Sequence, residues 1–218
     1  MAAQAKSINR GSSPGRPKGR TSSSSAYHHG DLRQALKEVA LEVLAGPDAH
    51  LLSFRELARR LGVTTAAPYH HFKDRADLLV SLAIDGFHCL HASMSQTAEA
   101  AGRDDSVVEK LTLAYLDFAY EQRGYYCAMF LPEVCALRDV PELRAAADLS
   151  FDYVCRAILH FHPQLAEQEV SERAVSLWSF LHGVVTLRAA GPLGRRLPQE
   201  REREFAVEGV WALLRLPE

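Results

Sequence analysis

The feature that most constrains this chain is the stretch SFRELARRLGVTTAAPYHHFKDR, which begins at Ser53. Ser53 with Glu56 three residues later forms a capping-box pattern, in which the serine oxygen accepts the Glu56 amide proton and the glutamate bonds back to the Ser53 amide. The pattern predicts a helix that begins at Phe54. Gly62 suits the left-handed residue that ends such a helix. A second short helix, with Thr64 as its N-cap, is expected directly after this tight turn.

Two helices joined by a tight glycine turn form a helix-turn-helix, whose second helix lies in the major groove of DNA. Periodicity predicts that Val63, Ala67 and Phe72 face the core, while Tyr69 faces outward. Pro68 is a local conflict, because it lacks an amide proton and disfavours α geometry at the residue before it. We expect the first turn of the helix to tolerate it.

The segment RELARRLGVTTAAPYHHFKDRADLL resembles the DNA-binding segment of the TetR family of bacterial regulators. The resemblance is carried by Ala58 in the first helix, by the Gly62-Val63 turn, and by Tyr69 two residues before His71-Phe72. It implies that the second helix and a basic residue just beyond it touch DNA. The predicted DNA contacts are Ser53, Thr64, Thr65, Ala66, Ala67, Tyr69, His70, His71, Lys73 and Arg75.

The predicted contacts divide into positioning and base-reading roles. We expect Tyr69 to bind a phosphate through its hydroxyl group, and Lys73 and Arg75 to hold the flanking DNA backbone. The second helix contains no Arg, Asn or Gln, the side chains that make bidentate contacts to bases, so direct readout should be limited. Methyl contacts to thymine, a hydrogen bond from His70 and DNA shape would supply the discrimination. His71 suits a local hydrogen bond as well as it suits a DNA contact.

Charge is distributed unevenly along the 218 residues, although the formal net charge is only −2. Residues 1–26 carry five basic side chains and no acidic one, and the acidic excess lies in the C-terminal half. This Ser- and Gly-rich arm is predicted to be disordered without DNA. Its Arg16, Lys18 and Arg20 either enter a narrow minor groove or add only non-specific attraction to phosphate.

The rest of the chain predicts an all-α protein, with a three-helix helix-turn-helix head at its N-terminus and a larger helical regulatory and dimerisation domain. A first helix from Leu32 should stop at Gly46-Pro47, and Gly124 should break a later helix. No strand-like alternation occurs in the sequence. The expected segments are the basic arm at 1–26, the DNA-binding head at 27–77, and the ligand-sensing and dimerisation domain at 78–218.

A second resemblance lies near the C-terminus, in SLWSFLHGVVTLRAAG. Trp178, His182 and Gly183 resemble the Trp-His-Gly pattern of a sensor type within TetR-like regulators. The predicted ligand pocket is apolar and aromatic, with His182 as a polar anchor. Trp178 and His182 equally suit a core pair or a dimer face. The predicted lining residues are Phe87, Tyr115, Phe118, Phe151, Trp178 and His182.

The leading hypothesis is a homodimeric, ligand-responsive DNA-binding regulator, a repressor released from a palindromic operator by a small molecule. Its expected partners are double-stranded DNA, an unidentified small-molecule effector and a second copy of the chain. The resemblance places the dimer contact on the last two long helices, about 167–190 and 199–214. We expect a cytoplasmic, nucleoid-associated protein of a bacterium, without a membrane span.

Two other classes of function are weighed against this hypothesis. An enzyme is disfavoured because the sequence lacks G-x-S-x-G, a P-loop, a dinucleotide fingerprint and H-E-x-x-H. A DNA-bound platform protein that does not act through transcription stays open. No cofactor and no metal site are predicted, because His88 and His91 have no second ligand pair nearby in sequence. The four cysteines lack paired spacing and predict reduced thiols in the core.

Overall fold

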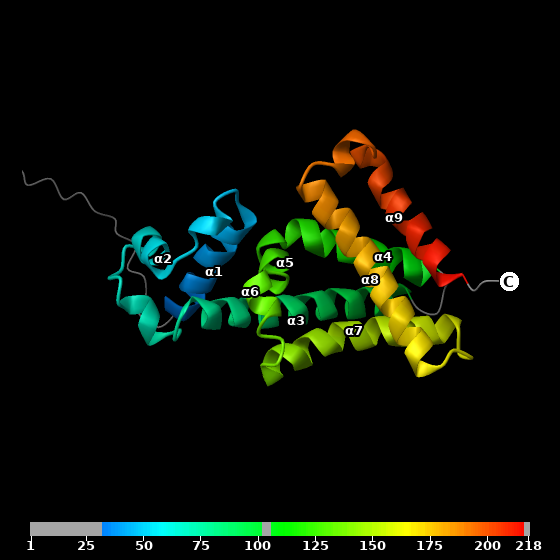
Figure 1. Ribbon diagram of the computed structural model, residues 1–218, viewed down its shortest axis with the longest axis horizontal. Coiled ribbons are helices and arrows are strands. Elements are labelled where there is room, and N and C mark those ends of the chain that lie inside the picture. The colour runs from blue at the N-terminus through cyan, green and yellow to red at the C-terminus, as the bar shows by residue number, and fades with distance from the viewer. Residues whose placement is uncertain (1–31, 102–105, 216–218) are drawn as a thin grey trace, which may run out of the picture.

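The computed structural model describes residues 32–101 and 106–215, so the predicted contacts Arg16, Lys18 and Arg20 lie outside the described residues. The described ranges contain helices and short 3₁₀ turns and no strand, which confirms the all-α prediction (Figure 1). The helices are α1 (Leu32–Ala45), α2 (Phe54–Leu61), α3 (Arg75–Ala101), α4 (Ser106–Glu121), α5 (Arg123–Met129), α6 (Pro132–Cys135), α7 (Pro141–Phe161), α8 (Glu167–Ala189) and α9 (Gln199–Leu214).

The head at one end of the molecule consists of α1, α2 and a 3₁₀ turn, η2 (Ala67–His70) (Figure 1). The buried residues of α1, such as Leu36, Ala40 and Val43, recur every three or four positions and therefore form one face. This face packs against α2 and α3. The helix ends at Ala45, where the Gly-Pro pair was predicted to stop it.

The longest helix, α3, belongs to both halves of the molecule. Asp74 Oδ1 accepts the Asp77 amide proton at 2.9 Å, and Asp77 Oδ2 accepts the Lys73 amide proton at 2.9 Å, so these acids cap its first turn. Leu78, Leu79 and Leu82 are completely buried. The predicted domain boundary after residue 77 falls inside the first turn of this continuous helix. The length and apolar composition of α3 would also suit a membrane span. In this structure, however, α3 packs against α1, α4, α5 and α7 as a core helix.

Gly124 was predicted to break a helix, and this prediction was wrong. The break between α4 and α5 lies at Gln122 (φ −103°, ψ 40°), and Gly124 is inside α5. Gly124 is needed because α5 crosses α1 in close contact. A Cβ atom at Gly124 would lie 2.5 Å from the Leu41 carbonyl oxygen, which is a rigid backbone atom. The absence of a side chain at this position therefore lets the larger domain pack closely against the head.

In the larger domain, α4 and α7 pack against α3 (Figure 1). α8 packs against α4 and α7, and α9 packs against α4 and α8. A buried carboxylate joins three of these helices. Glu202 of α9 is 4% exposed and accepts hydrogen bonds from Tyr120 of α4 and from Arg188 of α8. Arg188 also donates to the Leu197 carbonyl oxygen at 2.9 Å. Because an unpaired buried charge is costly, this network fixes α9 against its neighbours.

The cysteines do not occupy the core as predicted. Cys89 and Cys135 are exposed, Cys127 and Cys155 are half-buried, and all four are free thiols. Cys127 and Cys155 pack against the edge of the hydrophobic core, whereas Cys89 and Cys135 face solvent. The spacing argument against disulfides is thus confirmed for these four residues, and the burial argument was wrong.

The substitution Gly124→Ala should destabilise the protein by about 1–3 kcal/mol, because overpacking forces the backbones of α1 and α5 apart. The control is Gly46→Ala, since a Cβ atom there would meet nothing closer than 3.5 Å. Thermal unfolding followed by circular dichroism should show a lower Tm for Gly124→Ala and little change for Gly46→Ala. Equal Tm values for the two variants would contradict the close contact.

Candidate nucleic-acid interface and internal cavity

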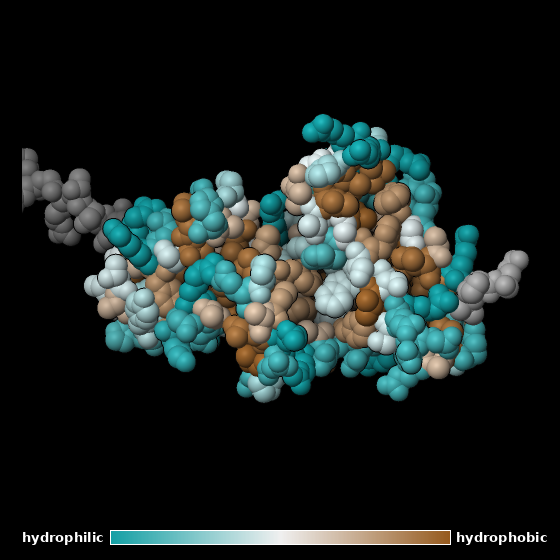
Figure 2. Space-filling model, in the orientation of Figure 1, coloured by the Kyte–Doolittle hydropathy of each residue, from teal (hydrophilic) through white to brown (hydrophobic). Residues whose placement is uncertain are grey.

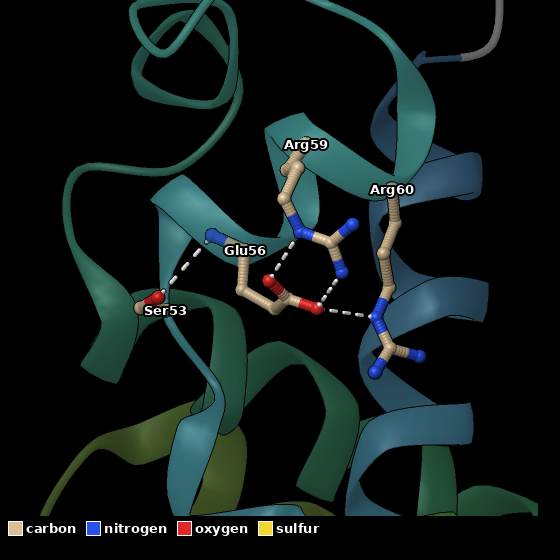
Figure 3. A network of polar contacts seen from close by, with 4 residues as sticks. All are labelled: Ser53, Glu56, Arg59 and Arg60. Atoms are coloured by element: carbon tan, nitrogen blue, oxygen red, sulfur yellow. Dashed lines mark hydrogen bonds and ion pairs between the residues drawn. The ribbon is translucent and has the colours of Figure 1, made fainter.

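The first half of the helix-turn-helix forms as the sequence predicted. Ser53 has extended geometry, and its Oγ accepts the Glu56 amide proton at 3.3 Å, so α2 begins at Phe54 (Figure 3). Gly62 adopts the left-handed conformation (φ 68°, ψ 26°), and its amide proton bonds to the last carbonyl groups of α2. The chain then leaves the helix with the Val63 amide donating to the Ala58 carbonyl oxygen at 3.0 Å.

The second bond of the predicted capping box is absent, because Glu56 binds two arginines of its own helix (Figure 3). The Glu56 carboxylate accepts hydrogen bonds from Arg59 at 2.6 and 2.8 Å and from Arg60 at 2.8 Å. Hydrogen bonds from Arg59 and then Arg60 lower the pKa of Glu56 to about 2. These residues lie three and four positions after Glu56, which is the spacing of neighbouring side chains on a helix.

The predicted second helix is a 3₁₀ turn, and the α-helix prediction with Thr64 as N-cap was wrong. Pro68 cannot donate a backbone hydrogen bond and disfavours α geometry at Ala67. The segment therefore closes with hydrogen bonds between residues three positions apart instead of four. The Tyr69 amide donates to the Ala66 carbonyl oxygen at 3.1 Å, and the Ala67 amide donates to that of Thr64 at 3.0 Å. The resulting surface, residues 64–73, is called the 64–73 turn below.

Packing beneath the 64–73 turn also differs from the prediction. Phe72 is buried as expected, at 2% exposure, but Val63 and Ala67 are only half-buried. Pro68 fills the core in their place. The proline ring therefore explains the 3₁₀ geometry of this turn. It also explains why Pro68 packs into the core while Val63 and Ala67 stay half-buried.

Most of the predicted DNA contacts are accessible in the 64–73 turn. Tyr69 is 62% exposed, and its ring lies edge-on against Phe54 with ring centroids 4.9 Å apart. The buried Phe54 ring thus supports Tyr69 from below. The exposed residues are Thr64, Thr65, Ala66, Tyr69, His70 and Lys73, and the half-buried ones are Ser53, Ala67, His71 and Arg75.

Arg75 contacts its own chain instead of standing free for a phosphate. Its Nε donates to the Leu52 carbonyl oxygen at 2.9 Å, and its Nη1 pairs with Glu133 of α6. One arginine therefore joins the start of α3, the segment before α2, and the larger domain. This arrangement differs from the predicted role of Arg75 as a backbone contact.

Arg33 is a further residue that positions the 64–73 turn, and sequence reasoning missed it. Its Nη1 donates to the His71 carbonyl oxygen at 2.9 Å, and its guanidinium lies 4.3 Å from the centre of the Phe72 ring. Nη2 also lies 3.4 Å from Ser81 Oγ of α3. Because these partners are 38 or more positions away in sequence, no local pattern signals the role.

The larger domain contains a partly open cavity of about 110 Å³. Of the six residues predicted to line it, Phe87, Tyr115, Phe151 and Trp178 do so. Phe118 is buried elsewhere in the core, so its assignment to the pocket was wrong. The remaining lining residues are Leu90, Met94, Val108, Leu111, Thr112, Phe130, Ala147, Ser150, Val154, Ala157, Ile158, Phe161, Ala174, Leu177, Leu181, Val210 and Leu214.

His182 also does not line the cavity, although it was predicted as the polar anchor. It lies behind the residues that line the cavity, and its Nδ1 is 2.7 Å from the Tyr126 hydroxyl oxygen. The Tyr126 hydroxyl lies 3.2 Å from that of Tyr115, which does line the cavity. His182 therefore reaches the cavity through two tyrosines.

An exposed turn on a helix-turn-helix scaffold, joined by one helix to a larger helical domain with an apolar cavity, defines a DNA-binding class of fold. Residues 36–82 match the family described as "Bacterial regulatory proteins, tetR family", and residues 108–209 match "Tetracyclin repressor-like, C-terminal domain". The chain belongs to the TetR family of transcription regulators. No curated protein matches the chain significantly.

Solved structures show the same fold. A protein of unknown function from Rhodococcus sp. RHA1 is 30% identical, with a TM-score of 0.67, over 86% of this chain and 97% of the other. The TetR family regulator PfmR from Thermus thermophilus is 21% identical, with a TM-score of 0.60, over 85% and 99%. The multidrug binding protein EbrR, complexed with imidazole, is 19% identical, with a TM-score of 0.57, over 85% and 96%.

The pKa of Glu56 leads to a prediction about acid stability. The pKa falls from its ordinary value of 4.5 to about 2 in the folded protein, so the unfolded chain binds a proton more readily. The stabilisation is therefore complete above pH 4.5 and is lost as the pH falls toward 2. Urea unfolding at about pH 5 and about pH 3 should show a larger loss of stability for the wild type than for Glu56→Gln. Equal losses would contradict the hydrogen-bonded pairing.

Arg33 and Lys73 should affect DNA binding in different ways. Arg33→Met keeps the apolar stem but removes the bond to His71, so it should weaken binding while the slope of log K against log salt stays unchanged. Lys73→Ala should reduce that slope by about 1, because it removes the predicted phosphate contact. Fluorescence anisotropy over a salt series measures both. The control is Arg144→Ala, whose partner Asp139 lies outside the head. A reduced slope for Arg33→Met would contradict the positioning role.

Proposed function

We propose that the protein is a homodimeric repressor that leaves a palindromic operator when a small molecule binds in the cavity. The observation that carries the proposal is the pairing of the exposed 64–73 turn with an internal cavity through one continuous helix, α3. In this proposal the head at 27–77 binds DNA, and residues 78–218 sense the ligand and dimerise. The protein acts in the cytoplasm, where its DNA lies.

The proposed DNA contacts come from the exposed residues of the 64–73 turn. Tyr69 and Lys73 bind phosphates and set the position of the head, while Thr65, Ala66 and His70 face the base edges. Because the turn is short, one head covers little DNA. A symmetric dimer with two heads about 34–36 Å apart supplies the affinity and explains a palindromic site.

The proposed dimer surface lies on α8 and α9. A protomer of a soluble protein seldom exposes many large apolar side chains in one region unless another surface covers them. Several such side chains of the described chain lie on these two helices, over which Figure 2 shows apolar patches. They are Val175, Trp178, Leu187, Phe205 and Leu213, each at least 36% exposed.

The proposed coupling between ligand and DNA passes through α3 and α5. Phe87 of α3 and Phe130 at the end of α5 both line the cavity. The same α5 lies against α1 of the head at Gly124 and Leu41. A ligand that moves these walls changes the spacing of the two heads, provided that it binds one spacing more tightly than the other. The similar EbrR structure, described as that of a multidrug binding protein complexed with imidazole, supports a small-molecule site in this fold.

The proposal predicts that Val175→Glu yields a monomer that loses specific DNA binding, because it places a charge within the apolar dimer surface. The control is Leu149→Glu on α7, where the leucine is similarly exposed, at 42% against 48% for Val175. Sedimentation velocity should show a dimer for the wild type and for Leu149→Glu. Gel shifts on the promoter DNA next to its own gene should show binding by these two proteins.

Three results would contradict the proposal. The wild type could sediment as a monomer, or it could fail to bind the promoter DNA in competition with unrelated DNA. Specific binding without any change in transcription when the gene is deleted would instead favour a DNA-bound platform protein.

A further inference from the structure

The wall of the cavity is almost entirely apolar. Among its described lining residues, none is Asp, Glu, Lys, Arg or His. A carboxylate or an ammonium group in this space would lack a charged partner, and burial of an unpaired charge is strongly unfavourable. The cavity of about 110 Å³ is somewhat smaller than an engineered cavity of about 150 Å³ that binds benzene. Its size therefore limits a bound ligand to about one aromatic ring.

Two of the hydroxyl groups in the wall already donate their protons to the protein. Thr112 Oγ1 donates to the Val108 carbonyl oxygen at 2.8 Å, and Ser150 Oγ donates to that of Phe87 at 3.2 Å. These groups satisfy backbone carbonyls and have no proton left for a ligand. Tyr115 is the third hydroxyl-bearing residue of the wall.

The hydroxyl of Tyr115 ends a chain of two hydrogen bonds. Tyr115 Oη lies 3.2 Å from Tyr126 Oη, which lies 2.7 Å from His182 Nδ1. If His182 Nδ1 accepts a proton, both tyrosines donate toward it, and Tyr115 keeps a free lone pair. If His182 Nδ1 carries the proton, both bonds reverse, and the Tyr115 O–H group is free. The indole N–H of Trp178 also donates to this oxygen. Either order still leaves one hydrogen-bonding position at Tyr115, and a hydroxyl group of a ligand can match both.

Burial keeps this chain of side chains neutral. It raises the pKa of Tyr115 to about 12, against the weaker opposite effect of hydrogen bonds with Tyr126 and Trp178. It also raises the pKa of Tyr126 and lowers the pKa of His182. A charged ligand would therefore find no counter-charge in this chain of residues either.

We propose that the cavity binds a compact, uncharged aromatic molecule with one hydroxyl group, and that this group bonds to Tyr115. His182 acts as a positioning residue, because it orients Tyr115 through Tyr126 and fixes which partner donates the proton. The inference rests on the proposed function, in which this cavity holds the effector, and it defines the chemical class of that effector.

Three probes with the same tolyl body test the class by calorimetric titration of the full chain. p-Cresol should bind roughly three- to tenfold more tightly than toluene, which corresponds to one net hydrogen bond. 4-Methylbenzoate should bind at least about a hundredfold more weakly than p-cresol, because its charge is unpaired. Tighter binding of the benzoate, or absence of binding by both neutral probes, would overturn the proposal.

Substitutions along the hydrogen-bonded chain test the residues. Tyr115→Phe should abolish the preference for p-cresol over toluene and leave toluene binding unchanged. The matched control Tyr153→Phe removes a hydroxyl from a half-buried tyrosine of α7 that does not line the cavity, and should keep the preference. Tyr126→Phe and His182→Leu should each change the p-cresol to toluene ratio by at least about threefold. An unchanged ratio in both variants would overturn the positioning role of His182.

Two further measurements separate this inference from the proposed function. Ala147→Leu narrows the cavity without touching the three linked residues, so it should weaken both neutral probes even if Tyr115→Phe fails to fold. Binding of p-cresol without release of promoter DNA would support the ligand class and count against the repressor mechanism. Release of DNA by 4-methylbenzoate would overturn the ligand class and support the mechanism.

Discussion

The burial of α3 is the constraint on which the rest of the structure depends. Its first leucines, Leu78 and Leu79, complete the core of the head, and its later residue Phe87 lines the cavity of the larger domain. The two halves of the molecule therefore share one continuous hydrophobic core. In the proposed function, a change in the cavity wall reaches the head through this shared helix.

Within the head, intramolecular contacts engage most of the charged side chains that might have met DNA. Arg59 and Arg60 bind Glu56, Arg75 binds Glu133, and Arg33 holds the His71 carbonyl group. The Arg33 contact fixes the 64–73 turn, the Glu56 pairs stabilise α2, and Arg75 joins the head to the larger domain. DNA recognition in the proposed function then rests on a small set of exposed residues around Tyr69.

Sequence reasoning succeeded where the signal was local and failed where a distant partner decided the outcome. The Ser53 cap, the left-handed Gly62 and the start of α3 at Arg75 follow from patterns a few residues long. Pro68 was recognised as a conflict, but its effect on the whole turn was underestimated. The network around His182 could not be predicted, because its partner Tyr126 lies 56 positions away in sequence.

The sequence by itself determined the all-α class, the end of α1, the limits of α2 and the TetR family, because capping, glycine turns and helical periodicity act over a few residues. The tertiary structure decided which predicted site residues are available. It tied Arg75 to Glu133, moved His182 behind the cavity wall and set Gly124 against Leu41. These outcomes depend on how helices far apart in sequence cross one another, and no short pattern encodes the angle and distance of such a crossing.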